Sequence, residues 1–130
     1  MNKSVFALIL LAGLSSQAAQ VPVFKCTVPG KVSSVTVDVA VSDSEAVDYV
    51  TVDLNDKGAS KLFMQNAKGS FQKQVDAGSV TTLVLGDQYS QGDDGVIRDA
   101  GILGLGLENG KWTGILSVND AVYPLDCTKL

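Results

Sequence analysis

The dipeptide Asn109-Gly110 constrains this chain more than any other feature, because it lies between two apolar runs within residues 101–127. A two-residue hairpin turn needs a positive φ at both central positions, and Asn and Gly accept that conformation readily. A turn at this point sets the pairing of the flanking strands: Glu108 with Lys111, Leu107 with Trp112, Leu105 with Gly114, and Leu103 with Leu116. Opposite charges then meet beside the turn, and the apolar residues share one face.

A second, weaker turn signal, Asn119-Asp120, extends the same register to a third strand. It pairs Leu116 with Tyr123, Gly114 with Leu125, and Trp112 with Cys127. One register therefore satisfies both turns and keeps a single apolar face. We predict that this face is buried and consists of Leu103, Leu105, Leu107, Trp112, Leu116, Tyr123, Leu125 and Cys127.

Short segments of alternating polarity continue through the rest of the chain, about ten residues apart and separated by turn residues. The clearest is residues 32–41, where valines alternate with polar or small residues. A more polar segment alternates Phe71, Lys73 and Val75 with glutamines and is predicted to be a strand of the kind found at a sheet edge. The pattern predicts an all-β fold, a small antiparallel β-barrel or sandwich of eight to nine short strands with mostly up-and-down connections.

Four glycines inside the predicted strands favour the barrel over the sandwich. They are Gly101, Gly104, Gly106 and Gly114. A glycine weakens a strand unless it permits a bend or a close approach. Grouped near one corner, these glycines predict the strong coiling of a small closed barrel.

The N-terminus has the pattern of a secretory signal peptide. Lys3 is followed by an apolar run at residues 5–14, which is too short to span a bilayer, and then by small residues that suit cleavage after Ala18. We therefore predict a signal peptide at residues 1–18 and a single domain at residues 19–130. The protein is expected to be exported, to the periplasm or to the extracellular space.

Two cysteines, Cys26 and Cys127, lie in the first and last predicted strands. An oxidising compartment favours a disulfide between them. In the chain-entropy model, closing a loop of this length stabilises the fold by about 4–5 kcal/mol. We predict that the disulfide joins the two ends of the β-sheet.

The composition limits the classes of function. Without the predicted signal peptide, the chain has nine basic and fourteen acidic residues, a net charge of −5. Such a chain is a poor candidate for binding nucleic acid, and no further apolar segment approaches the length that spans a membrane. The absence of histidine excludes Ser-His-Asp and Cys-His arrangements and imidazole metal ligands. We therefore expect a non-enzymatic protein without a cofactor.

The longest polar stretch of the mature chain, residues 86–95, is the candidate binding site. Long loops at the rim of a rigid β-scaffold commonly carry recognition residues. A tyrosine there offers a large, rigid contact surface, and the flanking acidic residues suit a basic partner. The predicted binding residues are Asp87, Tyr89, Asp93, Asp94 and Arg98.

Other interpretations of these residues remain open. The three aspartates could bind calcium, which takes several oxygen ligands, or the stretch could be plain surface. Arg98 could hold a carboxylate or a phosphate at the barrel mouth, or form an exposed pair with Asp99.

Phe24-Lys25-Cys26 near the mature start, together with Cys127, is similar to the corresponding residues of periplasmic lysozyme-inhibitor barrels. The resemblance covers those residues alone, and no inhibitory loop motif can be placed on the chain. The leading hypothesis is an exported domain that binds a macromolecular partner, a protein or an envelope component, as an inhibitor or adhesion-type factor. The alternatives are a calycin-like carrier of a small apolar ligand and a passive structural component of the envelope. The sequence does not indicate an oligomeric state.

Overall fold

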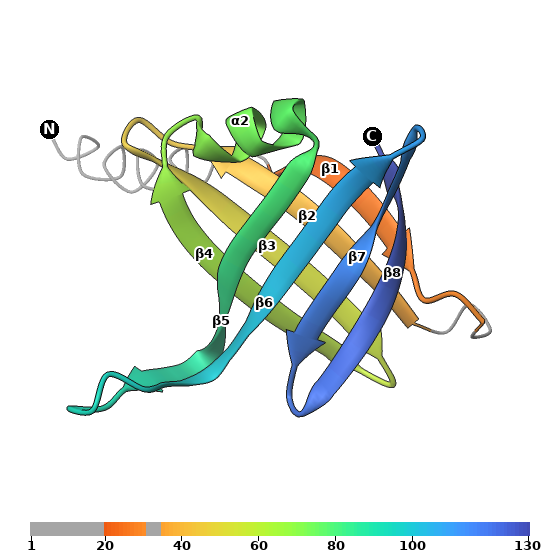
Figure 1. The fold of residues 1–130 in the computed structure, drawn as a ribbon. Helices are drawn as coiled ribbons and strands as arrows, with labels where there is room; N and C mark the ends of the chain where they lie inside the picture. The colour runs from red at the N-terminus through yellow and green to blue at the C-terminus, as the bar shows by residue number, and fades with distance from the viewer. Residues whose placement is uncertain (1–19, 31–34) are drawn as a thin grey trace, which may run out of the picture.

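The computed structural model describes residues 20–30 and 35–130, so the predicted signal peptide lies outside the described residues. Within them, antiparallel strands form a closed barrel in which each strand neighbours the next along the chain (Figure 1). The strands are β1 (Val21–Thr27), β2 (Val35–Asp43), β3 (Val47–Asp56), β4 (Ala59–Ala67), β5 (Ser79–Gln91), β6 (Ile97–Glu108), β7 (Lys111–Val118) and β8 (Ala121–Lys129), and helix α2 (Ser70–Ala77) joins β4 to β5. The predicted all-β barrel with up-and-down order is confirmed.

The register predicted around Asn109-Gly110 is also confirmed. All four predicted pairs join β6 to β7, and the three pairs predicted across Asn119-Asp120 join β7 to β8. Asn109 and Gly110 have φ values of 54° and 80°, and Asn119 and Asp120 have values of 52° and 62°. Both hairpins therefore have the positive φ angles on which the prediction depended.

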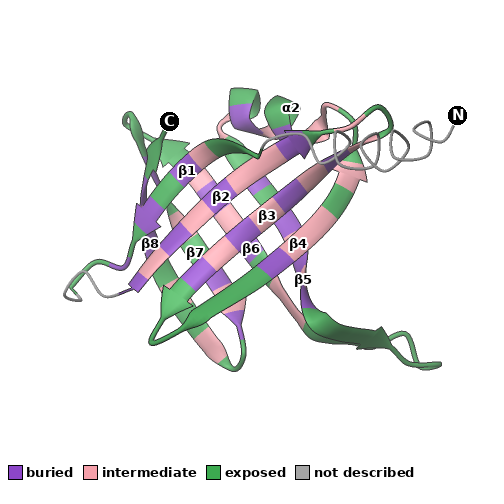
Figure 2. Ribbon diagram, turned by 180° about the vertical axis from the view of Figure 1, so that it is seen from behind, coloured by how far each residue is buried: buried purple, intermediate pink, exposed green. Residues whose placement is uncertain are grey.

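Inward side chains fill the barrel. Figure 2 shows buried and less buried residues alternating along β2 and β3, as expected for strands with one buried face. The rings of Phe24 and Trp112 pack edge to face with their centroids 4.9 Å apart, and both side chains are buried. The buried apolar residues form one continuous cluster, so packed side chains occupy the barrel interior.

Two residues of the predicted buried face depart from the prediction. Leu107 is 46% exposed, because it lies at the end of β6, where its backbone N–H donates to the carbonyl of Gly78 (2.9 Å). Tyr123 is only partly buried and packs at the margin of the core. The predicted alternation of inward and outward side chains holds at both positions, but the buried core does not extend to the ends of the strands.

The barrel closes along two seams of different construction. β1 pairs with β8 over four residue pairs, which include Cys26 opposite Cys127. These cysteines form the predicted disulfide, with their Cα atoms 4.0 Å apart. β4 pairs with β5 only at Phe63 opposite Leu85. A covalent bond thus closes one seam, whereas the other seam has little backbone pairing.

The segment predicted as a polar strand at residues 71–75 is instead part of helix α2. The strand interpretation places Lys73 on the same face as Phe71 and Val75, but a helix brings Phe71 and Val75, four residues apart, onto one face and leaves Lys73 exposed. Gly69 and Gly78 flank the helix with φ values of 81° and 78°. These glycines are the helix boundaries that the strand interpretation overlooked.

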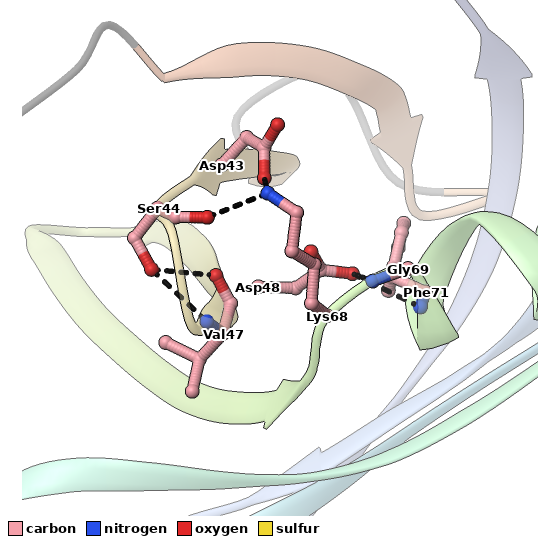
Figure 3. A network of polar contacts seen from close by, with 7 residues as sticks. All are labelled: Asp43, Ser44, Val47, Asp48, Lys68, Gly69 and Phe71. Carbon is pink, nitrogen blue, oxygen red and sulfur yellow. Dashed lines mark hydrogen bonds and ion pairs between the residues drawn. The ribbon is translucent and has the colours of Figure 1, made fainter.

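A carboxylate from the barrel caps helix α2. Gly69 at the N-cap position has no side chain, and Asp48 on β3 accepts hydrogen bonds from the backbone N–H groups of Gly69 (3.0 Å) and Phe71 (3.3 Å) (Figure 3). Beside it, Lys68 Nζ contacts an oxygen of Asp43 at 2.6 Å. Asp48 is 5% exposed, so a buried acid satisfies the first amides of the helix and attaches the helix to the sheet.

The strand glycines separate into two groups. A Cβ atom at Gly101 would overlap the carbonyl oxygen of Ser117, and one at Gly114 would overlap the carbonyl oxygen of Gly104. These two inward positions permit the close approach of β6 and β7, as the coiling argument predicted. Gly104 and Gly106 have no atom within 4 Å of the position that a Cβ would take, so the coiling argument does not apply to them.

Candidate functional site

The stretch predicted as a loop, residues 86–95, belongs mostly to a β-hairpin. β5 continues to Gln91 and β6 begins at Ile97, with Ser90 opposite Arg98 and Gln91 opposite Ile97. Figure 1 shows this hairpin leaving the barrel wall and projecting away from it. We call residues 86–99 the arm. The loop prediction is therefore wrong except at the tip of the arm, and all five predicted binding residues lie on this one element.

A bulge forms the base of the arm. Leu85 is paired with Ala100 and Ser90 with Arg98, so four residues of β5 lie opposite the single residue Asp99. Asp99 has a φ of 60°, and its Oδ2 atom accepts the backbone N–H of Gln88 at 2.7 Å. A bulge of this kind bends the strand and ends the regular pairing.

Gly86 makes this bulge possible. A Cβ atom at Gly86 would lie 2.5 Å from the carboxylate oxygens of Asp99. An exposed pair between Asp99 and Arg98 was one of the two interpretations of Arg98, but the carboxylate of Asp99 instead packs against the opposite strand. The direction in which the arm leaves the barrel is thus set by the contact between Gly86 and Asp99.

The tip of the arm is a tight turn that Asp94 stabilises. Oδ1 of Asp94 accepts the backbone N–H of Val96 at 3.0 Å, and the N–H of Gly95 donates to the carbonyl of Gly92 at 2.9 Å. Arg98 Nη2 lies 3.9 Å from Oδ2 of Asp94. Arg98 therefore points along the arm toward its tip, with Asp94 as its acidic neighbour.

Tyr89 connects the arm to the outer wall of the barrel. Its ring packs edge to face on Phe63 of β4, with centroids 6.0 Å apart, and Phe63 stacks on Tyr49 of β3 at 5.9 Å. We call Tyr49, Phe63 and Tyr89 the aromatic row. Tyr49 and Phe63 were not predicted to be part of the site, although the outward position of Phe63 between the inward residues Leu62 and Met64 was a usable signal.

The arm presents an apolar and acidic surface to solvent. Tyr89 is 50% exposed, Val96 46% and Ile97 37%, and Asp87 and Asp93 are exposed beside them. Among residues 20–30 and 35–130, these two aspartates form no ion pair. Exposed apolar groups rimmed by polar residues are typical of protein interaction sites.

Two hollows lie at the ends of the barrel, away from the arm. One, of about 290 Å³, is lined by apolar residues that include Val21, Val23 and Phe71, with Lys68 at its margin. The other, of about 460 Å³, includes Tyr123 and Asp56. Tyr123 Oη donates to Oδ2 of Asp56 at 2.7 Å, and this hydrogen bond, with partial burial and the negative charge, raises the pKa of Tyr123.

The described part of the chain contains no group of three His, Cys, Asp or Glu side chains placed to share a metal ion. In particular, Asp94 accepts a hydrogen bond from the turn backbone and lies beside Arg98.

None of the helices in the described ranges has the length and apolar character needed to cross a membrane.

Comparisons with protein-family models, with curated proteins and with solved structures give no match for this chain. The resemblance to lysozyme-inhibitor barrels therefore stays restricted to Phe24-Lys25-Cys26 and the disulfide with Cys127.

Proposed function

We propose that this protein is an exported, non-enzymatic domain that binds a macromolecular partner through its arm. The observation that carries the proposal is the arm itself, a β-hairpin that projects from a closed barrel and exposes Tyr89, Val96 and Ile97. Large apolar side chains that are exposed on a projecting hairpin do not stabilise the fold. Contact with a partner is favourable in free energy, because it removes their apolar surface from water.

The construction of the barrel favours a macromolecular partner over a small ligand carried inside. The interior is filled by one continuous cluster that includes Phe24, Leu103, Trp112 and Leu116. A carrier of calycin type needs that space for its ligand. The arm, by contrast, offers an elongated outer surface of the kind that meets another large molecule.

The charge of the arm indicates the chemistry of the partner. The arm contains four acidic residues and one basic residue, and the basic residue, Arg98, is already close to Asp94. A partner surface with exposed Lys or Arg beside apolar groups would complement Asp87, Asp93 and Tyr89. Binding of this kind is expected to weaken as ionic strength rises, because exposed charges are screened.

Two further observations support export. The disulfide between Cys26 and Cys127 is consistent with an oxidising compartment, and the N-terminal sequence has the features of a signal peptide. The partner is then a protein or an envelope component that an exported domain can reach.

Site-specific photo-crosslinking in the native host tests the proposal. A photoreactive amino acid at Gln91 on the arm is expected to trap a partner, whereas the same group at the outward position Asp38 of β2 is expected to trap none. Raised salt is expected to reduce the yield from position 91. Equal crosslinking from both positions, or none from position 91, would contradict the proposal.

A further inference from the structure

The arm is a two-stranded ribbon that is paired at few positions. Its strands pair only at Ser90 opposite Arg98 and at Gln91 opposite Ile97. Every residue from 87 to 99 is exposed, so the arm has no core of its own. An isolated two-stranded hairpin is at best marginally stable in water, and sheets become stable with three or more strands. A third strand would therefore stabilise the arm.

The hydrogen bonds of the arm show which way its backbone groups point. The N–H of Gln88 donates to Oδ2 of Asp99 at 2.7 Å, and the N–H of Gly92 donates to the carbonyl of Val96 at 3.0 Å. Both acceptors lie on the opposite side of the hairpin. The N–H groups at positions 88 and 92 therefore point toward β6.

The side of β5 that faces away from β6 is an open edge. Backbone groups point to alternate sides along a strand, so the N–H and C=O groups of Tyr89 and Gln91 point away from β6. β4 pairs with β5 only at Phe63 opposite Leu85, before the arm begins, and no other strand of the described residues pairs with β5 on this side. We define the open edge as the backbone groups of Tyr89 and Gln91, two N–H donors and two C=O acceptors.

The open edge lacks the features that usually protect an edge strand. Natural proteins cover such edges, or place Lys or Pro there, and so prevent pairing with another chain. Residues 87–91, Asp-Gln-Tyr-Ser-Gln, contain neither Lys nor Pro, and all five are exposed. The bulge at the base turns the arm away from the barrel wall (Figure 1), so this edge faces solvent.

We propose that an extended segment of the partner pairs with the open edge as the third strand of the arm. This inference rests on the proposed function, because it names the form in which the partner of the arm binds. Strand addition gains affinity from main-chain hydrogen bonds and specificity from alternate side chains. From residue 88 to residue 92 the edge is about 17 Å long, which suits a segment of about five residues.

The two faces of the arm indicate the sequence of that segment. Gln91 lies opposite Ile97, so Tyr89 and Ile97 share one face of the ribbon, and Ser90 and Arg98 share the other. Alternate residues of an added strand extend these two faces, so apolar residues are expected beside Tyr89. The arm has four acidic residues and one basic residue, so Lys or Arg is expected at the positions between them.

An eight-residue peptide that alternates valine and lysine is the probe for the open edge. Amide hydrogen exchange of the disulfide-bonded protein, followed by NMR, reports on single N–H groups. With the peptide at about 1 mM, exchange at Tyr89 and Gln91 is expected to slow about fivefold or more, because these N–H groups become hydrogen-bonded. Exchange along β2 is expected to stay unchanged.

Gln91→Pro and Gln91→Ala form a matched pair that separates strand addition from contact by side chains. Both remove the side chain, whose Nε2 donates to the carbonyl of Gly95, but only proline also removes the N–H of the open edge. Proline is tolerated where the N–H of an edge strand faces solvent. We expect Gln91→Ala to bind the peptide within about threefold of the wild type, and Gln91→Pro to bind it about tenfold more weakly.

The same peptide with every peptide nitrogen methylated gives a second test, which does not depend on how the arm tolerates proline. It keeps the side chains but has no N–H donors, and it is expected to bind the wild type about tenfold more weakly. Binding as tight as that of the unmodified peptide overturns strand addition.

Two further results overturn it. One is unchanged exchange at Tyr89 and Gln91 with the unmodified peptide, and the other is equal binding of that peptide by the two variants. Photo-crosslinking from position 91 in the host tests the arm without reference to strand pairing. A partner trapped there, together with either of these results, would leave the proposed function standing and remove only the strand addition.

Discussion

Strands β5 and β6 run through both the barrel and the arm, but their side chains are buried in the barrel and exposed in the arm. In the barrel, β5 and β6 bury Val80, Val84, Leu103 and Leu105, each exposed by less than 5%. Beyond the bulge at Gly86, the same strands pair at only two positions, and their side chains are exposed. Burial, and with it stability, is therefore concentrated in the barrel, and the part of β5 and β6 to which we assign partner binding contributes little to it.

The disulfide is expected to have the largest effect on stability, because it closes the seam between β1 and β8. Reduction of Cys26–Cys127 opens a loop with a sequence separation of 101 residues. The chain-entropy model predicts a loss of about 4–5 kcal/mol. Urea unfolding with and without reductant measures the loss, and two titratable thiols in the unreduced, denatured protein would contradict the assignment.

Trp112→Ala tests the core of the barrel directly. The side chain is 5% exposed and packs edge to face on Phe24, so its removal leaves a large cavity. We expect a loss of about 3–5 kcal/mol in the free energy of unfolding. A loss below about 1 kcal/mol in chemical denaturation would show that the core is not packed as described.

Tyr123→Phe tests the rim of the barrel, where the expected effect is smaller. The hydrogen bond to Asp56, followed by partial burial, raises the pKa of Tyr123 above its ordinary value of 10.0. The raised pKa means that the neutral phenol stabilises the fold below pH 10, and that this contribution is lost as the pH rises through the pKa. The variant should be less stable by about 0.5 kcal/mol at pH 7, and the difference should shrink above pH 10. A difference that is constant with pH would contradict the assignment.

The arm substitutions are expected to affect stability least. Asp93→Ala and Asp94→Ala change exposed residues, so each should stay within about 0.5 kcal/mol of the wild type. Tyr89→Ala also loses the packing on Phe63 and should cost at most about 1 kcal/mol. Melts with calcium and with a chelator should coincide. A midpoint that rises with calcium, and no longer does so in the aspartate variants, would assign the arm to metal binding.

The sequence was sufficient to predict the elements whose signals are local. Asn109-Gly110 and Asn119-Asp120 specify both their turns and their register, because each turn needs positive φ angles that few residues adopt. The disulfide followed from two cysteines in the terminal strands. Helix α2 was missed because Phe71 and Val75, four residues apart, fit a period of two as well as they fit one face of a helix.

The form of the candidate site could not be predicted, because it depends on contacts between distant residues. Nothing near Gly86 in the sequence shows that Asp99 lies against it, and the bulge that directs the arm depends on this contact. The aromatic row likewise joins residues from three strands, Tyr49, Phe63 and Tyr89. The polarity and the acidic residues of residues 86–95 are local properties, so the sequence was sufficient to single out the segment that forms most of the arm.

Binding of a partner through the arm is tested by measuring both folding and partner binding on one variant. In Tyr89→Ala/Asp93→Ala/Asp94→Ala the arm loses its exposed ring and two of its acidic side chains, while the barrel core stays intact. The control is Asp38→Ala, which removes an outward acid from β2. Titration of the partner trapped at the arm, together with a thermal melt, measures both properties. For the triple variant we expect a melting midpoint within a few degrees of the wild type and partner binding at least about tenfold weaker than that of the control. Equal binding by the triple variant and the control would contradict it.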